Sequence, residues 1–219
     1  MAGKVVAVTG GALLVAVLIA AYVLFLTNGP TPYRVPVANA GTVRQSVNLT
    51  LETVAAVGPT LSPHENWVSY LVRENGVWDR STVWTLPANT TVHVTIYNFD
   101  GDSGLRNPFL AQARGVNSYA VNGKAVKLID PDDASHTFAV AQLGILVPIL
   151  GVADDAKNQC GFAPCGLSNA HNTITFTFRT GKKGHYRWQC LVPCAAGFVY
   201  GFGGPMQTVG YMDGYLDVV

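Results

Sequence analysis

An uncharged apolar block near the N-terminus constrains this chain more than any other feature of its sequence. Residues 5–26 form a run of 22 positions without a charged side chain, and the first charge after Lys4 is Arg34. In a helix such a run is about 33 Å long, enough to cross the hydrocarbon core of a bilayer. We therefore predict one transmembrane helix over residues 1–28. A polytopic transporter is excluded, because no second run of this kind follows.

The same block has some features of a secretory signal peptide. Residues 38–40 (Ala-Asn-Ala) have the small-x-small form of a cleavage site. The apolar core of a signal peptide is about 7–15 residues long, however, and this block is longer, so an uncleaved signal anchor is favoured. Lys4 precedes the block, and positive charge tends to stay in the cytoplasm. We expect a single-pass protein of the cell membrane, with its domain on the extracytoplasmic side, where disulfides can form.

The remaining sequence predicts a short linker followed by one all-β domain. Residues 29–40 are rich in proline and read as a stiff spacer before a domain at 41–219. Apolar side chains alternate over residues 91–97 and 173–178, as expected when one face of a strand is buried. Asn75-Gly76 and Asn122-Gly123 are hairpin-turn signals between apolar runs. Many short strands with Gly and Pro turns predict a β-sandwich or barrel.

The charge of the chain argues against one class of partner. Only 12% of its residues are charged, and the formal net charge is +1. Proteins that bind nucleic acid through phosphates carry clustered Lys and Arg side chains. The sequence shows no such cluster, so we expect no nucleic-acid partner.

Two cysteines and one histidine carry the chemistry that the sequence suggests. Cys190 and Cys194 are spaced to clamp one metal ion or bridge two, and His136, at the head of an apolar strand, offers an imidazole. Thiolate sulfur combined with imidazole nitrogen suits copper. Met206 or Met212 is a candidate thioether ligand. A disulfide between the two cysteines and a merely packed His136 are the alternatives.

The other two cysteines have a different predicted role. Cys160 and Cys165 lie in one short insertion that contains Asp and Gly residues. The C-x-x-x-x-C spacing lets the two Cα atoms come within bridging reach. We predict a disulfide between them rather than a metal site.

These motifs together resemble the exported cupredoxin domain of subunit II of haem-copper (cytochrome c) oxidases. Residues 135–138 (Ser-His-Thr-Phe), followed by 142–145 (Gln-Leu-Gly-Ile), are similar to the family segment that carries its first histidine ligand. Residues 184–186 (Gly-His-Tyr) and 189–190 (Gln-Cys) resemble the strand that leads into the ligand loop, and Cys190 and Cys194 have the spacing of its binuclear copper centre. The resemblance implies a cupredoxin-like Greek-key β-sandwich.

Position by position, the resemblance also implies a ligand set. It gives His136 as a nitrogen ligand, Cys190 and Cys194 as bridging thiolates, and the Val192 carbonyl as a weak oxygen ligand. The family's second histidine falls at Phe198 and its methionine at Gly201, so the pattern is incomplete. Met206 is then the best placed additional ligand. We expect mononuclear, sulfur-rich copper or a degenerate binuclear centre.

The resemblance implies a copper-binding electron-transfer subunit in a respiratory oxidase-type membrane complex. An oxidase subunit I and a redox donor protein would be its partners. A metal-free structural subunit with a Cys190–Cys194 disulfide and an anchored domain for copper delivery or storage are the alternatives. The sequence shows no acid–base pair, nucleophile elbow or phosphate loop. As an enzyme it would therefore be at most one subunit of a cytochrome c oxidase-type oxidoreductase.

Overall fold

The structure, a computed structural model, describes residues 2–27, 32–38, 46–194 and 204–219. It divides into two compact units, Met1–Pro30 and Thr31–Val219. The first unit contains the helix α1 (Ala2–Thr27), whose side chains are described over residues 10–24. Over the described residues, no helix combines the length and the apolar character needed to cross a membrane.

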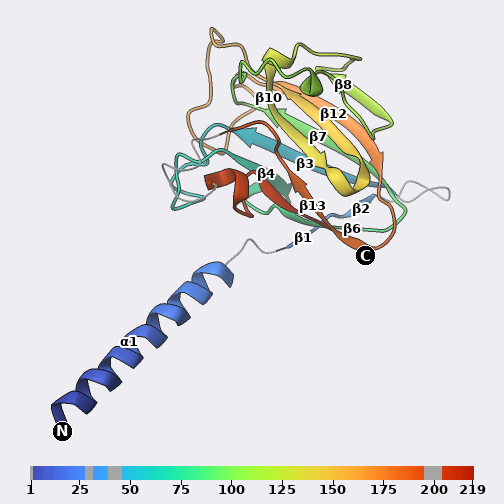
Figure 1. Cartoon of the computed structure of the whole chain (residues 1–219). Coiled ribbons are helices and arrows are strands. Elements are labelled where there is room, and N and C mark those ends of the chain that lie inside the picture. The colour runs from blue at the N-terminus through green and yellow to red at the C-terminus, as the bar shows by residue number, and fades with distance from the viewer. Residues whose placement is uncertain (1, 28–31, 39–45, 195–203) are drawn as a thin grey trace. The chain divides into compact units, whose positions relative to one another are not determined.

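The second unit is a sandwich of two sheets (Figure 1), which confirms the predicted all-β class. One sheet has the spatial order β1 (Tyr33–Arg34), β6 (Val83–Leu86), β14 (Asp213–Val218), β13 (Gly184–Gln189), β10 (Ala134–Val140) and β11 (Ile145–Leu150). The other has the order β5 (Val77–Asp79), β4 (Ser69–Glu74), β3 (Ser46–Val54), β7 (Thr91–Asn98), β12 (Asn172–Arg179), β8 (Ser118–Val121) and β9 (Lys124–Ala125), with β2 (Val37–Ala38) paired to β3.

Short 3-10 helices connect several of these strands. They are η2 (Pro108–Ala111), η3 (Pro131–Asp133), η4 (Ala141–Leu143) and η5 (Gly204–Gln207). Most strand pairs are antiparallel, but β6 runs parallel to both β1 and β14, and β3 runs parallel to β7. The strands β1 and β2 lie in the stretch for which the sequence predicts only a spacer, and Val35 between them is 2% exposed. Part of the proline-rich stretch therefore belongs to the sandwich.

The two Asn-Gly signals form the hairpin turns that the sequence predicts. Asn75 and Gly76, between β4 and β5, have φ values of 49° and 86°. Asn122 and Gly123, between β8 and β9, have φ values of 50° and 76°. Turns with positive φ at both central residues match the twist of the flanking strands, and Asn-Gly adopts them at low cost. The sequence thus fixes both hairpins locally.

The main core lies between the two sheets and is rich in aromatic rings. Phe176 and Phe178 enter it from β12, Phe138 from β10 and Trp188 from β13. The Trp188 ring stacks on that of Trp84 with 4.8 Å between the ring centroids. Alternation along each strand sends every second side chain inward. The core thereby fixes the strands β10 and β13, whose ends carry the chemically reactive side chains.

Candidate metal centre

His136 lies in β10, close to the point where this strand departs from regular pairing. The register between β10 and β11 shifts between Ala134 and His136, which marks a bulge or local irregularity. Such irregularities re-aim side chains and are common beside functional sites. The side chain of His136 is almost completely buried, although it is polar.

The two cysteines lie in the loop that follows β13, and backbone contacts tie this loop to the sandwich. The Cys190 N–H donates to the Met212 carbonyl at 2.9 Å, just before β14 begins. The Leu191 N–H donates to Thr137 Oγ1, the residue after His136, at 2.7 Å. These two bonds fasten the first turn of the loop to the neighbouring strands, so Cys190 is held next to β10.

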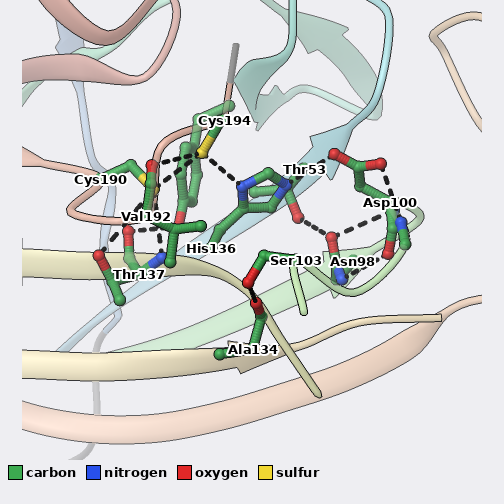
Figure 2. A network of polar contacts seen from close by, with 12 residues as sticks. Thr53, Asn98, Asp100, Ser103, Ala134, His136, Thr137, Cys190, Val192 and Cys194 are labelled. Carbon is green, nitrogen blue, oxygen red and sulfur yellow. Dashed lines mark hydrogen bonds and ion pairs between the residues drawn. The ribbon is translucent and has the colours of Figure 1, made fainter. Parts of the chain in front are cut away.

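Three potential ligand atoms converge at this place (Figure 2). One nitrogen of His136 and the sulfurs of Cys190 and Cys194 all lie within 4.8 Å of one another. The two sulfur atoms are 3.2 Å apart, and both cysteines are free in this structure. His136 Nδ1 lies 3.0 Å from Cys194 Sγ. The structure thus brings together the three side chains that the sequence predicts to share a site, one from β10 and two from the loop after β13.

Asp100 holds the other side of the imidazole ring. This residue follows β7, and its Oδ2 lies 3.0 Å from His136 Nε2. Figure 2 shows the ring between the cysteine sulfur on one side and the carboxylate on the other. A histidine that ligates a metal usually donates its other ring N–H to a carboxylate or carbonyl, which fixes its tautomer. With Asp100 beside Nε2, the other nitrogen of the His136 ring, Nδ1, faces the sulfurs.

Burial and these contacts change the protonation of the site. Burial alone would lower the pKa of His136, but its hydrogen bonds to Asp100 and to a cysteine sulfur raise that pKa to about 9. Burial would raise the pKa of Asp100, and the bond to His136 holds it below its usual value instead. Near neutral pH, without a metal, the imidazolium therefore carries two ring protons beside a carboxylate.

The two thiols have opposite tendencies. Burial would raise the pKa of Cys190, but hydrogen bonds from Cys194 and His136 hold it well below its usual range. The hydrogen bond to Cys190, together with burial, raises the pKa of Cys194. In addition, the Thr137 N–H donates to Cys190 Sγ at 3.4 Å. The pair therefore shares one proton, with the negative charge on Cys190.

The remaining predicted ligands are placed as follows. The Val192 carbonyl oxygen lies beside both cysteines, 3.5 Å from Cys190 Sγ and 3.0 Å from Cys194 Sγ. Met206 lies in η5, half-buried against the main core, and its carbonyl accepts a bond from the Gln189 side chain. Phe198 and Gly201 lie outside the described residues. The Val192 carbonyl thus borders the sulfur pair, and the Met206 side chain packs against the main core.

The other cysteines and histidines lie elsewhere. Cys160 and Cys165 are joined by a disulfide in the insertion between β11 and β12. Their insertion packs against a second, smaller core. The remaining histidines, His64, His93, His171 and His185, are half-buried or exposed. None of these residues belongs to the three-residue group found among the described residues.

Sequence reasoning missed Asp100 and Thr137. Asp100 stands just after the end of β7 and is followed by Gly101, and no motif in the sequence marks it as part of a metal site. Its separation from His136 along the chain carries no signal that the two side chains touch. The pairing depends on the loop after β7 lying beside the start of β10, which is a property of the assembled sandwich.

Comparison with known proteins gives no family for the chain. No protein-family model matches it, and no curated protein does. Among solved structures, it is similar to rusticyanin from Thiobacillus ferrooxidans, with 18% identity and a TM-score of 0.32 over 80% of this chain and 77% of that one. It is also similar to a multi-copper oxidase from Pediococcus acidilactici, with 9% identity and a TM-score of 0.36 over 88% of this chain and 29% of that one. These values are too low to establish a shared fold or function.

Proposed function

We propose that this chain is a membrane-anchored, cupredoxin-like copper protein that serves electron transfer in a respiratory oxidase-type complex. The observation that carries the proposal is the convergence of His136, Cys190 and Cys194 within 4.8 Å. The uncharged block at residues 5–26 supports the anchor. The two-sheet sandwich and the C-x-x-x-C loop after a strand support the cupredoxin assignment.

The donor set fits copper in its chemical character. It offers two sulfurs and one imidazole nitrogen, and thiolates select soft ions such as Cu(I). His136, Cys190 and Cys194 would hold the ion, with the Val192 carbonyl beside them as a weak donor. Bound copper would supply a one-electron redox couple.

The residues of the chain prepare this site in three ways. The Asp100 carboxylate lies 3.0 Å from His136 Nε2 and so favours a proton on that nitrogen, while Nδ1 lies 3.0 Å from Cys194 Sγ. The Thr137 N–H donates to Cys190 Sγ and stabilises its negative charge. Cys190 and His136 are each 1% exposed, so water is largely kept from these donors.

Copper analysis combined with thiol counting tests the proposal. The full chain, purified after copper supply and without chelators, should contain copper and show a sulfur-to-copper absorption that reduction bleaches. Cys190→Ser and Cys194→Ser should each remove the absorption, and His136→Ala should weaken it. The control His185→Ala changes an exposed histidine and should keep the copper.

Two results would contradict the proposal. The first is a protein that takes up no copper after gentle reduction and has Cys190 and Cys194 joined, which would support the metal-free structural subunit. The second is zinc in place of copper. Copper that binds but is removed at once by a weak chelator would favour delivery or storage over electron transfer.

A further inference from the structure

A cavity of about 400 Å³ opens beside the cysteine loop, and the copper site does not use it. Its floor includes Ala139 of β10 together with Arg187 and Gln189 of β13. These residues alternate with the core residues Phe138 and Trp188. The cavity therefore lies on the face of the sheet that points away from the core.

The walls of this cavity are mostly apolar. Ile145 and Leu146 of β11 contribute one part, and Phe109 of η2 and Leu191 of the cysteine loop contribute others. Phe109 and Leu191 are each 49% exposed. A concave apolar surface of this volume with a few polar groups is the usual form of a small-molecule site.

The charged groups of the cavity are both arginines. Arg187 is paired with Asp213, whose side chain is 2% exposed, so its charge is compensated. Arg114 donates one N–H to the Phe109 carbonyl at 3.0 Å and lies over the Phe109 ring. No carboxylate is among the lining residues that the structure describes. One guanidinium with further N–H donors therefore gives the cavity a net positive charge.

We propose that this cavity binds a small anion that combines a flat apolar ring with one negative charge, such as an aromatic carboxylate. The apolar walls would cover the ring, and the Arg114 guanidinium would bind the carboxylate as a planar pair. The site goes beyond the proposed copper function, because none of the three potential copper ligands lines it. It does border that function, since Leu191 is bonded to Cys190.

Equilibrium dialysis of the metal-free full chain, in one fixed detergent, tests this site with 2-naphthoate as the probe. The neutral 2-naphthamide has the same ring system without the charge. We expect saturable binding of 2-naphthoate. Binding of 2-naphthamide should be about tenfold weaker, because the neutral amide cannot form the charge-assisted pair with the exposed Arg114 guanidinium.

Matched variants locate the binding. Arg114→Gln should weaken 2-naphthoate about tenfold and leave 2-naphthamide unchanged, on the same argument. Arg106→Gln removes an exposed arginine that does not line the cavity, and should change neither. Ala141→Trp places a large ring at an exposed lining position of η4 and should abolish binding of both probes.

The outcomes that would overturn the inference are equally specific. They are the absence of saturable binding at millimolar probe, equal affinity for the two probes, and equal loss in the Arg114 and Arg106 variants. Unchanged binding to a folded Ala141→Trp protein would also overturn it. If that variant does not fold, the comparison of Arg114→Gln with Arg106→Gln decides the question by itself.

Discussion

Asp100 controls how His136 is presented to the sulfurs, because its carboxylate forms an ion pair with the other ring nitrogen, Nε2, at 3.0 Å. Asp100→Asn removes the charge that holds the Nε2 proton, and we expect copper affinity to fall about 10–100-fold. Competition against a chelator of known affinity measures this. Asp102→Asn, at an exposed position two residues later, is the control and should keep the parent affinity. Equal affinities in the two variants would show that Asp100 does not position the ring.

Glu52 is a buried carboxyl that does not belong to the metal centre. It is 0% exposed in β3, and its Oε1 accepts a bond from the Cys165 N–H at 3.5 Å. Within the described part of the chain its Oε2 has no hydrogen-bond partner. Burial raises the pKa of Glu52 from its usual 4.5 to about 8, and the bond from Cys165 opposes this only in part.

This burial predicts a pH dependence of stability. Between pH 4.5 and about 8 the folded protein binds more protons at Glu52 than the unfolded chain does. The free energy of unfolding should therefore fall as pH rises through this window, by up to about 1.4 kcal/mol per pH unit. Urea unfolding at pH 5 and pH 8 measures the change in stability. Glu52→Gln should make the stability fall less between these two pH values than it does in the parent, because the contributions of His136 and Cys190 are common to both proteins. A parent and variant with the same pH dependence would contradict the assignment to Glu52.

At the scale of single residues, sequence reasoning found the reactive groups but not their supports. His136, Cys190 and Cys194 belong to residue types whose chemistry is recognisable from spacing and from the family resemblance. Asp100 and Glu52 are ordinary acidic residues in the sequence, and only their neighbours in space distinguish them. Those neighbours come from distant segments, so no local pattern reveals them.

At the scale of elements, β14 depends on a close approach of backbones at Gly214. A Cβ at this position would collide with the Thr82 carbonyl and lie 2.6 Å from Trp188 Nε1. The same carbonyl accepts hydrogen bonds from the Tyr215 N–H and the Trp188 indole, both at 2.9 Å. Only glycine leaves room for these contacts.

Gly214→Ala should therefore destabilise the sandwich by about 3 kcal/mol, because the added methyl meets backbone and a packed ring. The midpoint of urea unfolding measures the loss. Gly161→Ala is the matched control, since a Cβ there would meet nothing within 4 Å. A Gly214→Ala protein as stable as this control would show that the strand can move aside.

Elements were predicted best where the local pattern decides them. The alternation in residues 91–97 and 173–178 corresponds to β7 and β12, and the Asn-Gly pairs form tight turns. The short strands β1 and β2 were missed because two residues cannot show a period. They form because β1 pairs with β6 and β2 pairs with β3. Such pairing between distant segments is tertiary information.

At the scale of the whole molecule, the two compact units predict that the sandwich folds without α1. A chain that begins at Thr31 should unfold cooperatively with the midpoint of the full chain and bind the same amount of copper. Urea unfolding can be followed by tryptophan fluorescence, since all four tryptophans lie in this unit: Trp67, Trp78, Trp84 and Trp188.

A shorter chain gives the contrast for this experiment. A chain that begins at Gly41 lacks β1, β2 and the buried Val35, and should have a lower unfolding midpoint. If both shortened chains unfold like the full chain, the pairing of β1 and β2 adds nothing to stability. If the chain from Thr31 is itself unfolded, the sandwich is not independent of the helix.

The place of β14 has a consequence for the order in which the protein can be made. This strand comes last among the described strands, yet it lies between β6 and β13 and joins the two halves of its sheet. Until residues 213–218 leave the ribosome, β6 and β13 present open edges that could pair with other chains. Cys190 also lacks its partner at Met212 until then. The cysteine loop can therefore take its final shape, and be ready for a metal, only after synthesis has passed this strand.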